Sequence, residues 1–99
     1  MVLDELRRGV VRVHILHHAS EGEVDGAWLA AELSRHGHRI SPGTLYPALH
    51  RMEEAGLLVS DRRSVEGKVH RFYTATASGR RELAAARRIL TELVGEVLP

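Results

Sequence analysis

The chain of 99 residues contains no cysteine, so disulfides, thiolate metal sites and cysteine nucleophiles are excluded. This composition fits a reducing compartment, and we expect a cytoplasmic protein. The sequence also lacks any run close to the roughly eighteen consecutive apolar residues of a membrane helix. Its start, with Asp4 and Glu5, lacks the form of a signal peptide. We therefore expect one domain that has no contact with a membrane.

Catalytic motifs are missing as well. The sequence has no glycine-rich phosphate loop, no nucleophile elbow and no clustered pair of carboxylates. It also has no internal repeat, low-complexity tract or linker. We therefore predict that the protein is not an enzyme and that it needs no cofactor.

Positive charge is in small excess overall, with a formal net charge of +1, but it is unevenly distributed. Residues 1–34 hold three arginines against six acids, residues 35–71 hold seven basic residues against four acids, and residues 72–99 hold four against three. A basic middle segment suggests a polyanion partner such as double-stranded DNA, because neutralising phosphates releases counterions. By itself the signal is weak, since extra arginines often belong to a solvated surface.

The most informative stretch is residues 40–58. Ser41 predicts a helix N-cap whose hydroxyl accepts a hydrogen bond from the first turn, and Pro42 suits the first helical position. Gly56 is the expected residue after the helix end. Between them, apolar residues recur at steps of three and four: Leu45, Ala48, Leu49 and Met52. We predict a helix over residues 41–55 with one buried face.

The opposite face of this helix is poor in acid and rich in side chains that read DNA grooves. It carries Gly43, Thr44, Tyr46, Pro47, His50 and Arg51. We expect Thr44, Tyr46, His50 and Arg51 to contact bases or phosphates, with Ser41, Gly43 and Pro47 beside them. The alternative is a core helix whose outer face meets only water.

Two helices are predicted before this one. Apolar residues keep helical spacing from Leu3 to about Ala19, and a second stripe makes this first helix apolar on two sides, which indicates packing against another subunit. A second helix runs from about Ala27 to His36 and ends at Gly37. We expect it to pack through Trp28, Leu29, Ala31 and Leu33. The second and third helices together are typical of a helix-turn-helix.

Two β-prone runs follow, Leu57–Ser60 and Val69–Thr74, and they predict one hairpin with a charged loop. Lys68 and His70 of this hairpin are candidates for contacts with phosphate or the minor groove. For Lys68 or His70 taken alone, a place in a solvated loop without DNA contact is nearly as good an interpretation.

Thr76 can cap a last helix from about Ala77 to Leu98, and this helix carries a heptad seam. We predict a homodimer interface made of Leu6, Val10, Leu83, Leu90, Leu93 and Val97. The expected fold class is mainly α with a two-stranded β wing. A winged helix-turn-helix DNA-binding domain would span residues 1–76, and a C-terminal dimerisation helix would span residues 77–99.

Two stretches resemble motifs of PadR-family transcriptional regulators. Residues 44–53, Thr-Leu-Tyr-Pro-Ala-Leu-His-Arg-Met-Glu, followed by Gly-Leu-Leu at 56–58, resemble the recognition helix of that family. Residues 71–79 are similar to its Arg-x-Tyr-Tyr-x-Leu-Thr-x-x-Gly pattern, with Phe72 for the first Tyr and Ala75 for Leu. The resemblance implies a dimeric regulator that binds a palindromic operator, most often as a repressor. It also implies that the helix continues through Pro47, where propensity alone would break it.

The sequence departs from the family pattern in two places. Gly26 is followed by Ala-Trp-Leu, where many members have a start like Gly-Tyr-Glu-Leu. Residues 77–99 contain no aromatic residue, which leaves unsupported the binding of flat drugs between paired tryptophans that some members use. We expect Trp28 to be a core residue. The operator, the regulated genes and a small-molecule effector stay open.

Seven histidines raise a metal hypothesis. His14 and His18 are spaced i, i+4, His17 adjoins them, and His36 and His38 are close in sequence. We favour polar or interface histidines over a metal site, because a pair without a third ligand is incomplete. A metal-responsive repressor stays an alternative, as does a winged-helix protein-interaction module without DNA binding.

Overall fold

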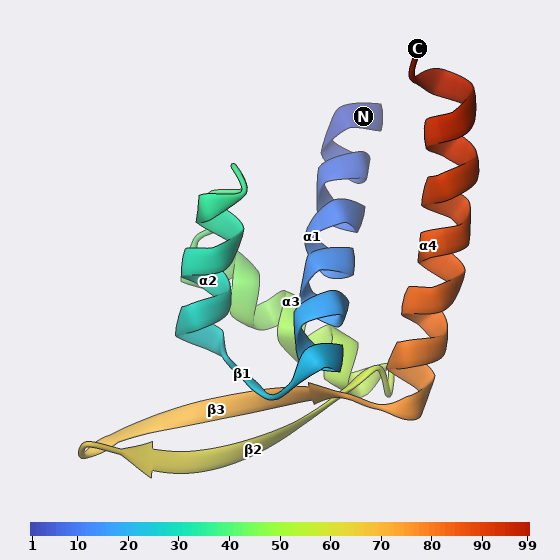
Figure 1. Ribbon diagram of the computed structural model, residues 1–99. Coiled ribbons are helices and arrows are strands. Elements are labelled where there is room, and N and C mark those ends of the chain that lie inside the picture. The colour runs from blue at the N-terminus through green and yellow to red at the C-terminus, as the bar shows by residue number, and fades with distance from the viewer.

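The computed structural model describes all 99 residues and confirms the predicted fold class, with helices packed on a small antiparallel sheet (Figure 1). The elements follow in the order α1 (Val2–Glu21), β1 (Val24–Asp25), α2 (Gly26–Arg35), α3 (Pro42–Glu54), β2 (Leu58–Val65), β3 (Lys68–Ala75) and α4 (Ala77–Val97). The hairpin of β2 and β3 extends away from the helices, and α4 runs antiparallel to α1 (Figure 1). None of the helices has both the length and the apolar character needed to cross a membrane.

One hydrophobic core joins α1, α2, α3 and the base of the sheet. Its fully buried side chains are Ile15, Leu29, Leu33, Leu45 and Leu49. All the buried residues of α1 lie in its second half, between Ile15 and Ala19. Leu3 and Leu6, in the first half, are exposed. The chain itself therefore covers the apolar stripes of α1 only toward the C-terminal end of the helix.

Asp25 is the N-cap residue of helix α2, and its carboxylate accepts a hydrogen bond from the Ala27 N–H at 3.2 Å. Leu29 and Leu33 are buried as predicted, because they lie one turn apart on the same face. The prediction that Trp28 and Ala31 are packing residues is wrong: Trp28 is 46% exposed and Ala31 is exposed as well. Trp28 precedes Leu29 by one residue and so points about 100° away from the only buried face of this helix.

Helix α3 has the buried face that the sequence predicts and continues through Pro47 without a break. Ser41 is its N-cap residue, but the Ser41 hydroxyl accepts no hydrogen bond from the first turn. Instead, the hydroxyl donates to Thr44 Oγ1 at 3.2 Å. That part of the prediction is wrong because the Thr44 N–H is already bonded to the Ser41 carbonyl, at 3.0 Å.

The wing is longer than predicted, and β1 adds a third strand that the sequence did not indicate. Strands β2 and β3 pair along their full lengths, and β1 pairs with β3 through Val24 opposite Tyr73. The sheet order is β1-β3-β2. The outer half of the hairpin is exposed and largely charged, so it has no alternating apolar pattern to detect. Glu66 and Gly67, with φ of 52° and 79°, make the two-residue turn, as in a type I′ hairpin.

Helix α4 is attached to the rest of the chain by its first turns. The Thr76 hydroxyl accepts from the Gly79 N–H at 3.0 Å and donates to the Gly56 carbonyl at 2.5 Å. Gly79 lies directly against the Leu57 carbonyl, and Leu83 is the last buried side chain of the helix. Every residue after position 90 is exposed. The last turns of α4, beyond Leu90, are therefore open to solvent.

Candidate nucleic-acid interface

The outer face of α3 is open to solvent. All six residues predicted for this face are exposed, and so is Ser41 at the helix start. The Tyr46 ring lies across the start of α2, where a Cβ added to Gly26 would come within 2.8 Å of Tyr46 Cε1. His50 Nε2 lies 3.6 Å from Glu54 Oε1 in an exposed pair, and Arg51 has no ion-pair partner. The face thus presents a phenol, an imidazole and a guanidinium within two turns of helix.

A chain of hydrogen bonds holds the wing at a defined place relative to α3. Arg71 Nη1 donates to Ser60 Oγ at 2.9 Å, and Ser60 Oγ donates to Glu53 Oε2 at 2.7 Å. Arg71 lies on β3, Ser60 on β2 and Glu53 in the last turn of α3. Arg71 therefore ties both strands of the hairpin to α3.

Two further contacts hold the wing against the start of α2. The Arg63 guanidinium lies 3.9 Å from the Phe72 ring centroid and pairs with Glu23 at 2.6 Å. His70 Nδ1 lies 3.0 Å from Asp25 Oδ2, and both of these side chains are partly buried. The structure thus places His70, a predicted phosphate contact, in a bond to the N-cap residue of α2.

A shallow basic hollow lies between the wing and the two helices of the helix-turn-helix. It is lined by Asp25, Ala27, Tyr46, Arg62, Lys68, Val69, His70 and Arg71. Arg62 and Lys68 are exposed and form no ion pair in the chain. The hollow therefore combines free positive charge on the wing with the Tyr46 side chain on α3.

A second basic groove, of about 240 Å³, lies on the other side of α3 and was missed by sequence reasoning. It contains five arginines and no acid: Arg7, Arg8, Arg12, Arg39 and Arg51. None of the five forms a hydrogen bond or an ion pair through its side chain. Three of these arginines come from α1, within residues 1–34, where acids outnumber arginines. The net charge of that segment therefore gave no sign of them. Only the packing of α1 beside α3 makes the cluster visible.

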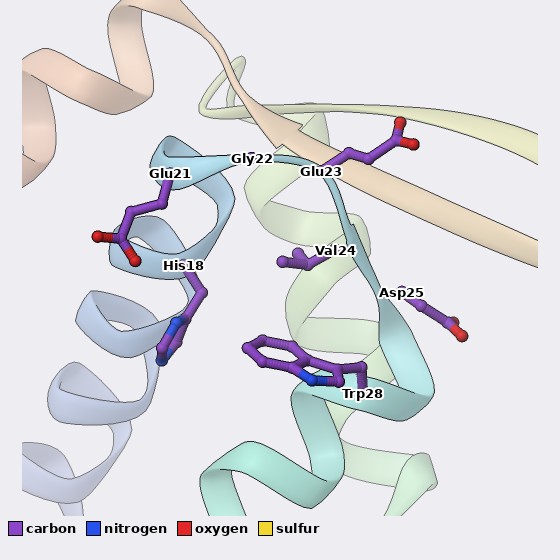
Figure 2. A pocket seen from close by; sticks show the side chains of 7 residues that line it. All are labelled: His18, Glu21, Gly22, Glu23, Val24, Asp25 and Trp28. Atoms are coloured by element: carbon purple, nitrogen blue, oxygen red, sulfur yellow. The ribbon is translucent and has the colours of Figure 1, made fainter.

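A third hollow, beside the end of α1, has the opposite charge. It is lined by His18, Glu21, Gly22, Glu23, Val24, Asp25 and Trp28 (Figure 2). The exposed Trp28 ring meets the His18 ring edge to face, with centroids 5.2 Å apart. Burial and the adjacent His17 lower the pKa of His18, which favours the neutral imidazole. Three carboxylates at one hollow make it unsuited to phosphate, so it lies outside the basic face.

Residues 15–85 match the transcriptional regulator PadR-like family. The chain belongs to the PadR-like family. Transcriptional regulator Rv3488 of Mycobacterium tuberculosis is 61% identical over 94 residues, which cover 95% of this chain and 88% of that protein. The family and this relative are transcriptional regulators and not enzymes, which agrees with the prediction.

Solved structures show the same fold. A PadR-family regulator from Eggerthella lenta is 34% identical, with a TM-score of 0.79 over 98% of this chain and 88% of that one. PadR of Bacillus subtilis, solved in complex with operator DNA, is 22% identical, with a TM-score of 0.69 over 77% of this chain and 45% of that one. At 22% identity, the likeness to PadR of Bacillus subtilis shows a shared fold and nothing more.

The largest apolar surface of this PadR-family protein lies along α1 and α4. Nine of the fourteen exposed large apolar side chains belong to the first six residues or to the last eleven. A groove of about 640 Å³ runs between the two helices and is lined by Leu6, Val10, Leu83, Leu90 and Leu93, among others. Val97 continues the surface toward the end of α4. Contiguous apolar surface of this kind marks an interaction site.

Proposed function

We propose that this PadR-family transcriptional regulator is a homodimeric repressor that binds a palindromic operator. Two copies of α3 would enter successive major grooves, as two-fold symmetric helix-turn-helix dimers do. The observation that supports this most strongly is the charge around α3. Its exposed outer face lies between the basic hollow of the wing and the groove of five unpaired arginines. PadR of Bacillus subtilis, which shares the fold, was solved in complex with operator DNA, and this supports DNA binding by the fold.

We assign the contacts by the position of each side chain. Thr44, Tyr46, His50 and Arg51 face outward from α3 and would meet base edges or phosphates. The start of the helix, with Ser41, Gly43 and Pro47, would approach the DNA backbone closely. Lys68 at the tip of the wing would contact phosphate or the minor groove. His70 would act indirectly, since its bond to Asp25 holds the wing in place.

The arginine groove adds a contact that follows from the packing of α1. Arg8 and Arg12 lie beside Arg51 in one groove without an acid, so a DNA strand next to α3 would neutralise them. Phosphate contacts of this kind position a protein on DNA without reading sequence. Each phosphate contact that is lost should reduce the slope of log affinity against log salt concentration by about one.

A band-shift titration tests DNA binding, using the promoter region upstream of the protein's own gene and a scrambled duplex of equal length. We expect preference for the promoter and an affinity that falls steeply with salt. Arg51→Ala should weaken promoter binding about 5–150-fold, the equivalent of about 1–3 kcal/mol. Arg12→Ala should weaken promoter and scrambled DNA alike.

Arg88→Ala is the matched control, because Arg88 is an exposed arginine of α4 far from α3 in the chain and outside both basic grooves. It should bind as the wild type does. Equal affinity for promoter and scrambled DNA at all salt concentrations would refute sequence-specific binding. If Arg51→Ala and Tyr46→Ala left regulation of the promoter intact, the protein-interaction module would be the better interpretation.

We further propose that residues 77–99 act as the dimerisation helix and residues 1–76 as the DNA-binding domain. The apolar groove between α1 and α4 is the surface available for a second copy. Light scattering should give twice the 11.0 kDa chain mass. Leu93→Asp, at an exposed position that leaves the chain's own core intact, should lower that mass. Val59→Asp, an exposed valine on the wing, should not. A monomeric wild type would refute the dimer.

A further inference from the structure

Four of the seven histidines gather at one place from three different segments of the chain. His14 and His18 lie on α1, His36 caps the end of α2, and His38 lies in the connection to α3. The His14 ring centroid is 5.2 Å from those of both His36 and His38, and 6.2 Å from that of His18. The fold therefore brings two further histidines, His36 and His38, to the pair on α1.

Two of the spacings between these rings, both measured from His14, fit a tetrahedral metal. With metal–nitrogen distances of about 2.0–2.1 Å, two imidazoles on one tetrahedral zinc ion have ring centroids about 5.2 Å apart. His36 and His38 both meet this value relative to His14. His18, at 6.2 Å, is too far for the same tetrahedral shell.

A carboxylate completes the set. Glu32 Oε2 lies 3.3 Å from His36 Nε2 and 3.6 Å from His18 Nε2, and its side chain is only 13% exposed. Two ligand atoms on one tetrahedral zinc ion are about 3.3–3.4 Å apart, so Glu32 and His36 can share an ion. Arg35 donates to both Glu32 oxygens, at 3.0 and 2.9 Å, which holds the carboxylate in place.

Two of the proposed ligand rings have no partner in the chain. His14 and His38 are both partly buried, and neither ring forms a hydrogen bond or an ion pair with the rest of the chain. Two rings without a protein partner, one of them 5.2 Å from the His36 ring, leave a position that a divalent cation would satisfy.

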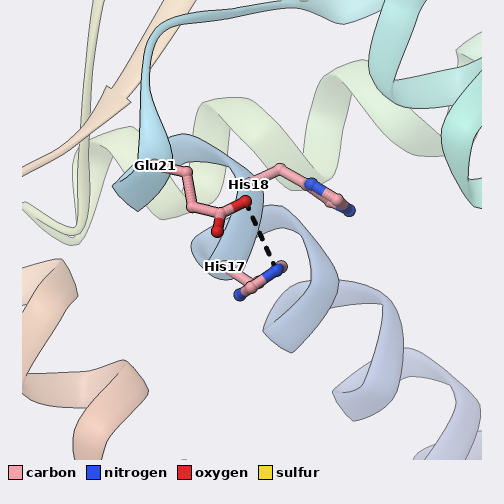
Figure 3. Close-up of side chains that lie close together, drawn as sticks. All are labelled: His17, His18 and Glu21. Atoms are coloured by element: carbon pink, nitrogen blue, oxygen red, sulfur yellow. Dashed lines mark ion pairs between the residues drawn. The ribbon is translucent and has the colours of Figure 1, made fainter.

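A second group of possible ligands, His17, His18 and Glu21, is less suitable. Their ligand atoms all lie within 4.8 Å of one another. However, His17 Nδ1 lies 3.1 Å from an Arg87 nitrogen and His17 Nε2 lies 3.5 Å from Glu21, so both ring nitrogens are engaged. Figure 3 shows His17 facing Glu21, whereas the His18 ring points away from that pair. The arrangement is that of a hydrogen-bonded surface histidine.

We propose that His14, His36 and His38 bind a divalent transition metal such as Zn²⁺, with Glu32 as the fourth ligand. His18 is a positioning residue, because it lies next to the same Glu32 oxygen that faces His36. The ring nitrogens of His14, His36 and His38 do not yet converge in this structure, and binding closes the site by rotation of these partly exposed side chains.

The position of the site links the metal to α3. His36 and His38 flank Gly37 in the connection between α2 and α3, and His14 belongs to α1. A bound ion therefore joins this connection to α1 and changes how freely α3 can move. This coupling rests on the proposed DNA-binding function, whereas metal binding itself does not.

Calorimetric titration of the tag-free dimer or monomer with Zn²⁺ tests the site directly. We expect one ion per chain, and at least tenfold weaker binding for both His14→Gln and His38→Gln. His17→Gln is the matched control on the same helix and should bind as the wild type does. Substitution with Co²⁺ should give the visible absorption of a tetrahedral ion, and this absorption should be absent in His38→Gln. No binding by the wild type, or loss in His17→Gln with full binding by His38→Gln, would overturn the site.

The coupling is tested by repeating the promoter band shift with Zn²⁺ and with a chelator. We expect Zn²⁺ to change the DNA affinity of the wild type at least fivefold and to leave that of His38→Gln unchanged. Because coupling between two binding sites is reciprocal, DNA should change the affinity for Zn²⁺ by the same factor. Zinc binding without a change in DNA affinity would refute the coupling and leave the site intact. Absence of any DNA binding would refute the proposed function, while the titration with Zn²⁺ would still decide the metal site.

Discussion

The sharpest prediction about stability concerns Gly79, at the junction between the wing and α4. A Cβ added there would overlap the Leu57 carbonyl oxygen and lie 3.4 Å from Leu16 Cδ2. The carbonyl cannot move away freely, because it accepts a hydrogen bond from the Thr76 N–H at 3.1 Å. Gly79→Ala must therefore shift α4 away from the domain or break that bond.

The magnitude follows from three effects. Overpacking costs about 1–3 kcal/mol, and a strained backbone hydrogen bond costs about 1 kcal/mol. Replacing glycine by alanine inside a helix returns about 0.5–1 kcal/mol. We expect a net loss of about 2 kcal/mol in the free energy of unfolding, or about 8–16 °C in melting temperature for a domain of this size.

Gly95→Ala provides the control, because Gly95 lies in the same helix and a Cβ there meets nothing within 4 Å. This variant should melt at or slightly above the wild-type temperature. Thermal unfolding followed by circular dichroism measures both, at one protein concentration because a dimer's midpoint depends on it. A Gly79→Ala variant as stable as Gly95→Ala would refute the close packing of α4 on the wing base.

Three further predictions test other parts of the structure. Leu29→Ala should cost about 2–5 kcal/mol in denaturant unfolding, whereas Trp28→Ala should stay within about 1 kcal/mol; equal losses would mean that Trp28 is covered. Gly26→Ala should displace the Tyr46 ring and weaken promoter binding in the band shift with little change in melting temperature, and unchanged affinity would contradict a role for Tyr46. Burial raises the pKa of Tyr73 above 10.0, so the unfolded chain ionises first and stability falls as pH rises through about 10. Tyr73→Phe should lose less stability between pH 9 and 11 than Tyr46→Phe, and equal losses would refute this cause.

Helix α3 was predictable because its signals are local. Pro42 at the first helical position, the apolar steps from Leu45 to Met52 and Gly56 after the end all act within one helix. Pro47 was the exception, since only the resemblance to PadR proteins indicated that the helix continues. The structure shows that it does. The short strand β1 was not predictable, because two residues carry no period and pair with a strand far along the chain.

The errors at Trp28 and Ser41 have a common cause. Hydrophobic character suggested that Trp28 is buried, but the neighbouring Leu29 determines which face of α2 meets the core. A serine before a helix suggested a capping bond, but the hydroxyl of Thr44 offers a competing acceptor. In both cases a neighbouring residue decides the outcome. The sequence pattern alone does not show whether Leu29 or Trp28 faces the core, or which partner the Ser41 hydroxyl takes.

The sequence by itself determined the order of the four helices and the two wing strands, the buried face of α3 and membership in the PadR-like family, because these depend on spacing and motifs within short segments. Only the tertiary structure decided which charged and titratable groups lie together. Arg12 and Arg51 line one groove, and the His14 ring lies beside the His38 ring, because α1 packs beside the helix-turn-helix. Contacts between residues far apart in the chain arise from how the apolar faces are buried together, and local spacing contains no record of them.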